Sequence, residues 1–94
     1  MTVRDRIREA LELRPHTSLQ LSQAVGIPQG EVAGHLEHLA RSLPHQGLVL
    51  EVDPARCIAC GFEFQDRRRF GRPSRCPRCK SERIDPPRFS VRSR

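Results

Sequence analysis

Four cysteines in two pairs are the residues of this chain best suited to chemistry. Cys57 and Cys60 form one C-x2-C pair, Cys76 and Cys79 form another, and fifteen residues separate the two pairs. Two residues between cysteines let a tight turn aim both sulfur atoms at one point, and two such turns supply the four thiolates of a tetrahedral metal ion. The spacing therefore predicts a single four-cysteine metal site.

Zn²⁺ is the predicted metal, and iron is the alternative. Four thiolates leave no open coordination position on zinc, so the site should be structural and not hydrolytic. The same four ligands can also hold a redox-active iron. Gly61 follows the first pair, where the turn needs a residue that tolerates positive φ. All four histidines precede Cys57, and none has ligand spacing to the pairs.

Positive charge is concentrated in the second part of the chain. The 94 residues have a formal net charge of +6, of which residues 1–52 contribute −1 and residues 53–94, with twelve basic and five acidic side chains, contribute +7. Such an excess favours a polyanionic partner, most often nucleic acid, although it also serves solubility. The candidate nucleic-acid contacts in this part are Arg67, Arg68, Arg69, Arg72 and Arg75.

Two amphipathic helices are predicted at the start of the chain. Thr2 can cap a helix over residues 3–13, whose apolar side chains repeat at helical spacing, and Pro15 disfavours its continuation. Thr17, followed three residues later by a glutamine, has the form of a capping box for a second helix. Gly26 is the residue that ends this second helix.

A third helix should start near Pro28 and stop before Pro44, because proline is tolerated only in the first turn of a helix. A short glycine-containing turn joins it to the second helix, which matches the dimensions of a helix-turn-helix. The second helix of such a motif enters the major groove by its N-terminal end. The candidate contacts there are Gln29, Gly30, Gly34 and His38.

Two β-rich runs, over residues 47–53 and 87–92, can pair as an antiparallel hairpin. Three helices followed by a hairpin make a winged helix. The predicted fold class is α+β, a three-helix winged helix-turn-helix whose β-hairpin wing carries a small zinc ribbon with four cysteine ligands. We expect residues 1–52 together with 85–94 to form the winged helix and residues 53–84 to form the inserted ribbon.

Three phenylalanines lie within the segment that contains the cysteine pairs. Phe62 and Phe64 flank one polar residue in a strand-like alternation, and we expect both rings to pack beside the metal-binding turns. Phe70 interrupts the arginine run. Its ring is either a filler of a small core or an exposed stacking surface.

Two stretches resemble known modules: TSLQLSQAVGIPQGEVAGHLEHLARSL and the pattern CxxCGFEF…CPxCKS. The first resembles the winged helix-turn-helix of small prokaryotic regulators of the ArsR-like kind, and the second resembles a rubredoxin-like zinc ribbon. Together they are similar to a family of proposed archaeal and bacterial transcriptional regulators in which a zinc ribbon is fused to, or inserted in, a winged helix. The resemblance implies metal binding by the four cysteines and DNA contact by the start of the third helix.

The leading interpretation is a DNA-binding transcriptional regulator with a structural zinc site and double-stranded DNA as partner. One alternative is a protein–protein adaptor, favoured by the acidic side chains of Glu31 and Glu37 on the third helix. Another is an Fe or Zn redox or metal sensor. A homodimer through the apolar face of the first helix stays open.

Several function classes are not expected. No Ser/His/Asp arrangement, phosphate-binding loop or paired-carboxylate site can be identified, so we expect neither an enzyme nor a small-molecule substrate. No apolar run approaches the roughly 20 residues that cross a bilayer. The charged N-terminus has no signal-peptide core, so we expect a cytoplasmic chain with reduced cysteines and no membrane contact.

Overall fold

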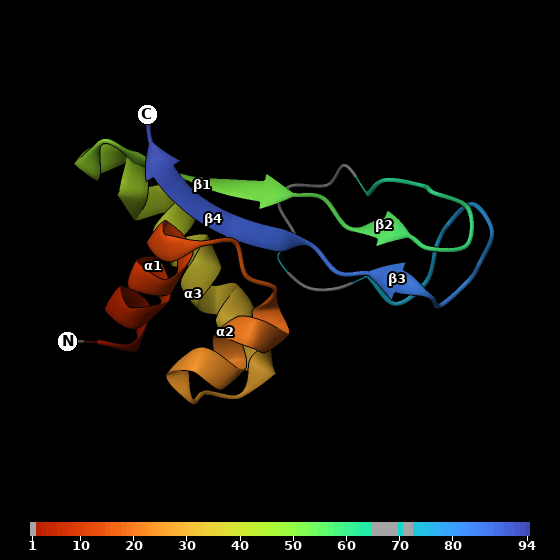
Figure 1. The fold of residues 1–94 in the computed structure, drawn as a ribbon, viewed down its shortest axis with the longest axis horizontal. Helices are drawn as coiled ribbons and strands as arrows, with labels where there is room; N and C mark the ends of the chain where they lie inside the picture. Colours follow the sequence, from red (N-terminus) through yellow and green to blue (C-terminus); the bar gives the residue numbers. More distant parts are fainter. Residues whose placement is uncertain (1, 65–69, 71–72) are drawn as a thin grey trace.

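The computed structural model describes residues 2–64, 70 and 73–94 of the chain. Figure 1 shows an elongated molecule with helices at one end and a narrow lobe at the other, and its principal extents are 42 × 28 × 19 Å. The described elements are α1 (Val3–Leu13), α2 (Ser18–Val25), α3 (Gln29–Ser42), the 3₁₀ turn η1 (Leu43–Gln46), β1 (Leu48–Asp53), β2 (Arg56–Cys57), β3 (Ile84–Asp85) and β4 (Arg88–Ser93). We call α1–α3 with β1 and β4 the helical body, and residues 54–87 the cysteine lobe.

Local sequence signals set the ends of the first two helices. The backbone N–H of Asp5 donates to Thr2 Oγ1 at 3.1 Å, and the Thr2 N–H donates back to Asp5 Oδ2 at 3.2 Å. Thr17 and Gln20 make the same reciprocal pair at the start of α2. Gly26 ends α2 with a left-handed φ of 72°, a conformation that glycine adopts without steric cost. The predicted capping residues are confirmed.

The strands form two small antiparallel sheets. β1 pairs with β4 in a register that runs from Leu48↔Ser93 to Asp53↔Arg88, which confirms the predicted pairing of the two β-rich runs. β2 pairs with β3 inside the cysteine lobe. On its other side, β4 exchanges two backbone hydrogen bonds with His16, between α1 and α2, at 2.9 and 2.8 Å. This bridge fastens the helices to the sheet.

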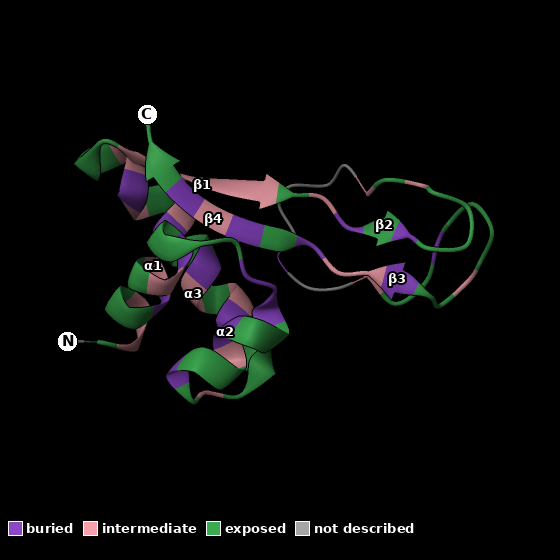
Figure 2. Cartoon of the chain, in the orientation of Figure 1, coloured by how far each residue is buried: buried purple, intermediate pink, exposed green. Residues whose placement is uncertain are grey.

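Two hydrophobic cores hold the molecule together (Figure 2). The larger lies in the helical body, where α1 packs against β4, α3 packs against β1, and α2 packs against the other two helices. The smaller lies in the cysteine lobe around Cys57, Cys76 and Ile84. One residue of the lobe, Phe70, belongs to the larger core. The buried members of the larger core are Ile7, Leu11, Leu21, Val25, Val32, Leu36, Leu39, Leu43, Phe70, Phe89 and Val91.

The predicted mixture of three helices with small antiparallel sheets is confirmed in the described residues. The winged-helix assignment and the division into residues 1–52 with 85–94 and residues 53–84 stay predictions. Among the helices described, none has both the length and the apolar character needed to cross a membrane.

Candidate metal centre

The first cysteine pair lies in a tight turn at the end of β2. The Gly61 N–H donates to the Cys57 carbonyl at 2.9 Å and closes the turn, with Gly61 at a φ of +79°. The expected positive φ at this glycine is confirmed. The Cys57 N–H donates to the Phe62 carbonyl at 2.8 Å, and the Ile58 N–H donates to the Arg83 carbonyl at 2.9 Å. These bonds hold the turn against the rest of the lobe.

The second pair repeats the same geometry. The Lys80 N–H donates to the Cys76 carbonyl at 2.8 Å, and the Cys76 N–H donates to the Ser81 carbonyl at 2.9 Å. Lys80 occupies the place that Gly61 has in the first turn and also takes a positive φ, 63°. Left-handed backbone costs a residue with a side chain roughly 1–2 kcal/mol, so the geometry of this turn is maintained against a local penalty.

The two turns bring all four sulfur atoms to one point. The ligand atoms of Cys57, Cys60, Cys76 and Cys79 lie within 4.8 Å of one another. Across the turns, the Sγ atoms of Cys57 and Cys79 are 3.5 Å apart, and those of Cys60 and Cys76 are 3.7 Å apart. A tetrahedral ion with metal–sulfur bonds of about 2.3 Å separates its ligands by about 3.8 Å. The four thiols therefore fit a tetrahedral ion.

Two family models together match almost the whole chain. Residues 2–50 match the model described as PF0610-like, N-terminal, and residues 54–94 match the PF0610 rubredoxin-like zinc beta-ribbon domain. The chain belongs to the PF0610-like family. No functionally curated protein matches it.

A solved structure resembles this PF0610-like chain over nearly its full length. It is the solution NMR structure of protein PF0610 from Pyrococcus furiosus, 31% identical in sequence, with a TM-score of 0.81. The similarity covers 98% of the present chain and 90% of the other. The resemblance to a rubredoxin-like zinc ribbon is thus confirmed, whereas the ArsR-like kinship stays a prediction.

The cysteine lobe of this PF0610-like chain is a zinc ribbon, and Zn²⁺ is the metal its four cysteines bind. The donor set fits the ion because four thiolates satisfy a tetrahedral zinc without water or substrate. When bound, such an ion supplies a cross-link between the two turns and no open site for chemistry.

The environment of the thiols favours a bound cation. Burial raises the pKa of Cys76, but the backbone N–H groups of Cys79 and Arg78 donate to its sulfur and bring that pKa down to about 6. The Ser81 N–H lowers the pKa of Cys79, yet the facing Cys57 thiol and burial raise it to about 12. The two cysteines of this turn thus differ in how readily each loses its proton. A bound divalent cation favours the thiolate form of both.

Aromatic packing supports the first turn. The rings of Phe62 and Phe64 meet edge to face, with centroids 5.1 Å apart at 88°, and both pack against the small core of the lobe. Their expected place beside the metal-binding turns is confirmed. The Phe64 N–H donates to the Ala55 carbonyl at 2.9 Å, so this segment lies along the strand that leads to Cys57.

The predicted nucleic-acid contacts fall into three groups. On α3, the residues Gln29, Gly30, Gly34 and His38 are all exposed, as is Arg75 in the lobe. The amide of Gln29 donates to Ser18 Oγ at 3.3 Å. Arg67, Arg68, Arg69 and Arg72 lie outside the described residues.

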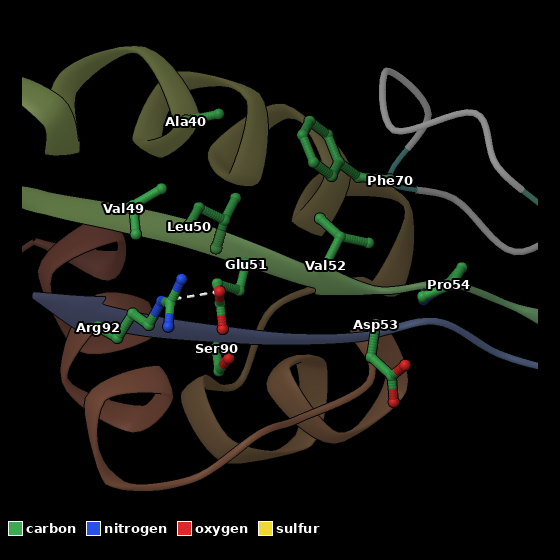
Figure 3. Close-up of a pocket in the computed structure, with 10 residues that line it drawn as sticks. All are labelled: Ala40, Val49, Leu50, Glu51, Val52, Asp53, Pro54, Phe70, Ser90 and Arg92. Atoms are coloured by element: carbon green, nitrogen blue, oxygen red, sulfur yellow. Dashed lines mark ion pairs between the residues drawn. The ribbon is translucent and has the colours of Figure 1, made fainter. Parts of the chain in front are cut away.

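An open groove of about 600 Å³ runs along β1 between α3 and the lobe (Figure 3). Phe70 lies at one end of it, near Val52. Glu51, another lining residue, pairs with Arg92, and its Oε1 atom lies 2.7 Å from Arg92 Nε. The described lining includes no cysteine or histidine. The cysteine cluster, and not this groove, is therefore the candidate site for chemistry.

Proposed function

We propose that this chain is a winged helix-turn-helix protein that binds double-stranded DNA and regulates transcription, with the zinc-bound cysteine lobe as a second DNA contact. The order of the elements supports the proposal. The turn between α2 and α3 is only three residues long, Gly26 to Pro28, and the paired strands β1 and β4 follow the helices. Helix-turn-helix and wing occur in this order in known DNA-binding domains.

The observation that carries the proposal is the cluster of exposed cations around the second cysteine turn. Arg75, Arg78, Lys80 and Arg83 are all exposed and lie within nine residues of one another along the chain. The zinc-bound thiolates remove about two positive charges from this neighbourhood, but the lobe stays basic. Arginine binds phosphate through a planar fork of donors, so these side chains suit a nucleic-acid backbone.

The exposed face of α3 would then lie close to the DNA. A Cβ added at Gly30 or Gly34 would meet no atom within 4 Å, so the helix backbone is bare at both positions. A helix without side chains at these positions can approach a DNA groove more closely than a helix that carries side chains there. Gln29 would have to exchange its hydrogen bond to Ser18 for one to a base. The affinity for DNA would therefore come mainly from the basic side chains of the cysteine lobe.

Binding of fluorescent duplex DNA, measured by anisotropy from about 50 to about 300 mM salt, tests the proposal. We expect affinity to fall steeply with salt, and the double variant Arg75→Ala/Arg78→Ala to reduce the slope of log affinity against log salt by about two. Arg6→Ala, an exposed arginine on α1, is the matched control and should leave the slope unchanged. Absence of binding at low salt, or binding that ignores salt, would contradict the proposal.

A second candidate function is a protein–protein adaptor. It is favoured by Glu31 and Glu37, which are exposed on α3 and would repel phosphate groups. Capture of one defined protein partner by a chain that has no affinity for duplex DNA would support the adaptor. In either case we propose that the chain acts by binding and not by catalysis, because a zinc ion closed by four cysteines offers no position for substrate.

A further inference from the structure

The four zinc ligands differ in their access to solvent. Cys57 and Cys76 are 1% and 0% exposed, whereas Cys60 and Cys79 are exposed. Each turn thus contributes one buried and one exposed cysteine. The first cysteine of each pair lies in the small core, and the second does not belong to that core.

The sulfur of each exposed cysteine lies close to the sulfur of a buried cysteine in the other turn. The Cys79 and Cys57 Sγ atoms are 3.5 Å apart, and the Cys60 and Cys76 Sγ atoms are 3.7 Å apart. Thiolate sulfur is the nucleophilic form of cysteine, and the cysteines most readily oxidised are accessible thiolates that have a second cysteine within reach. Cys60 and Cys79 meet both conditions when zinc keeps them deprotonated.

We propose that Cys60 and Cys79 are the first residues to react in a peroxide-sensitive modification site, in which hydrogen peroxide oxidises the zinc-bound sulfurs and expels the ion. The sulfur of an exposed thiolate attacks the peroxide, so that an S–O bond forms, the O–O bond breaks and hydroxide leaves. The facing buried thiolate then attacks the resulting sulfenic sulfur and displaces a second hydroxide. Each disulfide consumes one molecule of hydrogen peroxide and two protons, which convert the two hydroxides to water.

The geometry assigns the products. Disulfides Cys57–Cys79 and Cys60–Cys76 join the same two turns that the zinc ion joins, so the lobe stays cross-linked after the metal has left. The zinc-loaded site carries a charge of about −2, while two disulfides carry none. Oxidation therefore makes the lobe more positive without opening it.

Labelling of the intact zinc-loaded chain with substoichiometric iodoacetamide tests, without any substitution, whether Cys60 and Cys79 are the first cysteines to react. Peptide mass spectrometry should find Cys60 and Cys79 alkylated roughly tenfold or more faster than Cys57 and Cys76. The control is the chelated, urea-unfolded chain, in which the four rates should converge. Equal rates in the zinc-loaded chain, or faster labelling of a buried ligand, would overturn the assignment.

Titration of the zinc-loaded chain with hydrogen peroxide tests the reaction. A chromogenic chelator should detect zinc release, and all four thiols should be lost at the same time. The oxidised protein should also be retained longer on a cation-exchange column, because its net charge is more positive. Non-reducing peptide mapping should recover the two cross-turn disulfides, and dithiothreitol with zinc should restore the starting protein. Retention of zinc under excess peroxide, disulfides within each C-x2-C pair, or conversion to sulfonic acid without disulfides would each contradict the proposal.

Discussion

The ring of Phe70 in the cysteine lobe packs against the ring of Phe89 in β4, with centroids 5.9 Å apart and the ring planes at 63°. Phe89 is fully buried and Phe70 is 8% exposed, so the contact lies inside the core of the helical body. Edge-to-face aromatic pairs stabilise beyond the area they bury. The lobe is therefore anchored in the body by its own side chain as well as by the chain ends that enter β1 and β4.

The substitution Phe70→Ala should destabilise the whole chain. Removing a buried phenylalanine typically costs about 3–5 kcal/mol, because transfer energy is lost and a cavity remains. Urea unfolding of the zinc-loaded protein measures the effect, with Leu13→Ala as the control. Leu13 is 85% exposed, and its truncation should change stability by less than about 0.5 kcal/mol. An unchanged urea midpoint for Phe70→Ala would show that the lobe is not coupled to the body.

Gly34→Ala and Gly61→Ala should have opposite effects. At either glycine an added Cβ meets no atom within 4 Å, so the two sites differ in backbone conformation and not in space. Gly34 lies inside α3, where alanine is favoured by about 1 kcal/mol. Gly61 has a φ of +79°, where a side chain costs roughly 1–2 kcal/mol. Thermal melting of both zinc-loaded variants distinguishes them, and a change of the same sign in both would refute this assignment.

Asp5 should contribute a pH-dependent part of the stability of α1. Its pKa lies below the ordinary value of 3.8, chiefly because the backbone N–H of Thr2 donates to the carboxylate. A carboxylate whose pKa is depressed by folding stabilises the folded state at pH values above its pKa in the unfolded chain. This contribution is lost as the pH falls through the pKa of the folded state. NMR titration of the Asp5 carboxyl carbon measures the shift directly. Asp5→Asn should remove this part of the acid sensitivity, and a pKa at or above 3.8 would contradict the capping role.

Local signals in the sequence predicted the helical half well. Thr2, Thr17, Gly26 and Pro28 mark helix ends by interactions within one turn, so neighbouring residues suffice to place them. The cysteine spacing likewise predicted the metal site, because each C-x2-C turn is local and one ion imposes the rest of the geometry.

Long-range packing was less accessible from the sequence. The bridge between His16 and Phe89 joins residues that no local pattern relates, and it was not predicted. The sequence left Phe70 as either a core filler or an exposed ring, and the structure shows the filler, although in the body and not in the lobe. The split between buried and exposed cysteines was also missed, since identical C-x2-C spacing gives no sign of which cysteine is exposed.

The most direct test of this account is X-ray absorption at the zinc edge, combined with elemental analysis of the purified chain. We predict one zinc ion per chain with four sulfur neighbours at about 2.3 Å, contributed by Cys57, Cys60, Cys76 and Cys79. A metal-free chain that keeps its full thermal stability in strong chelator, iron in place of zinc, or a shell containing nitrogen or oxygen would contradict it.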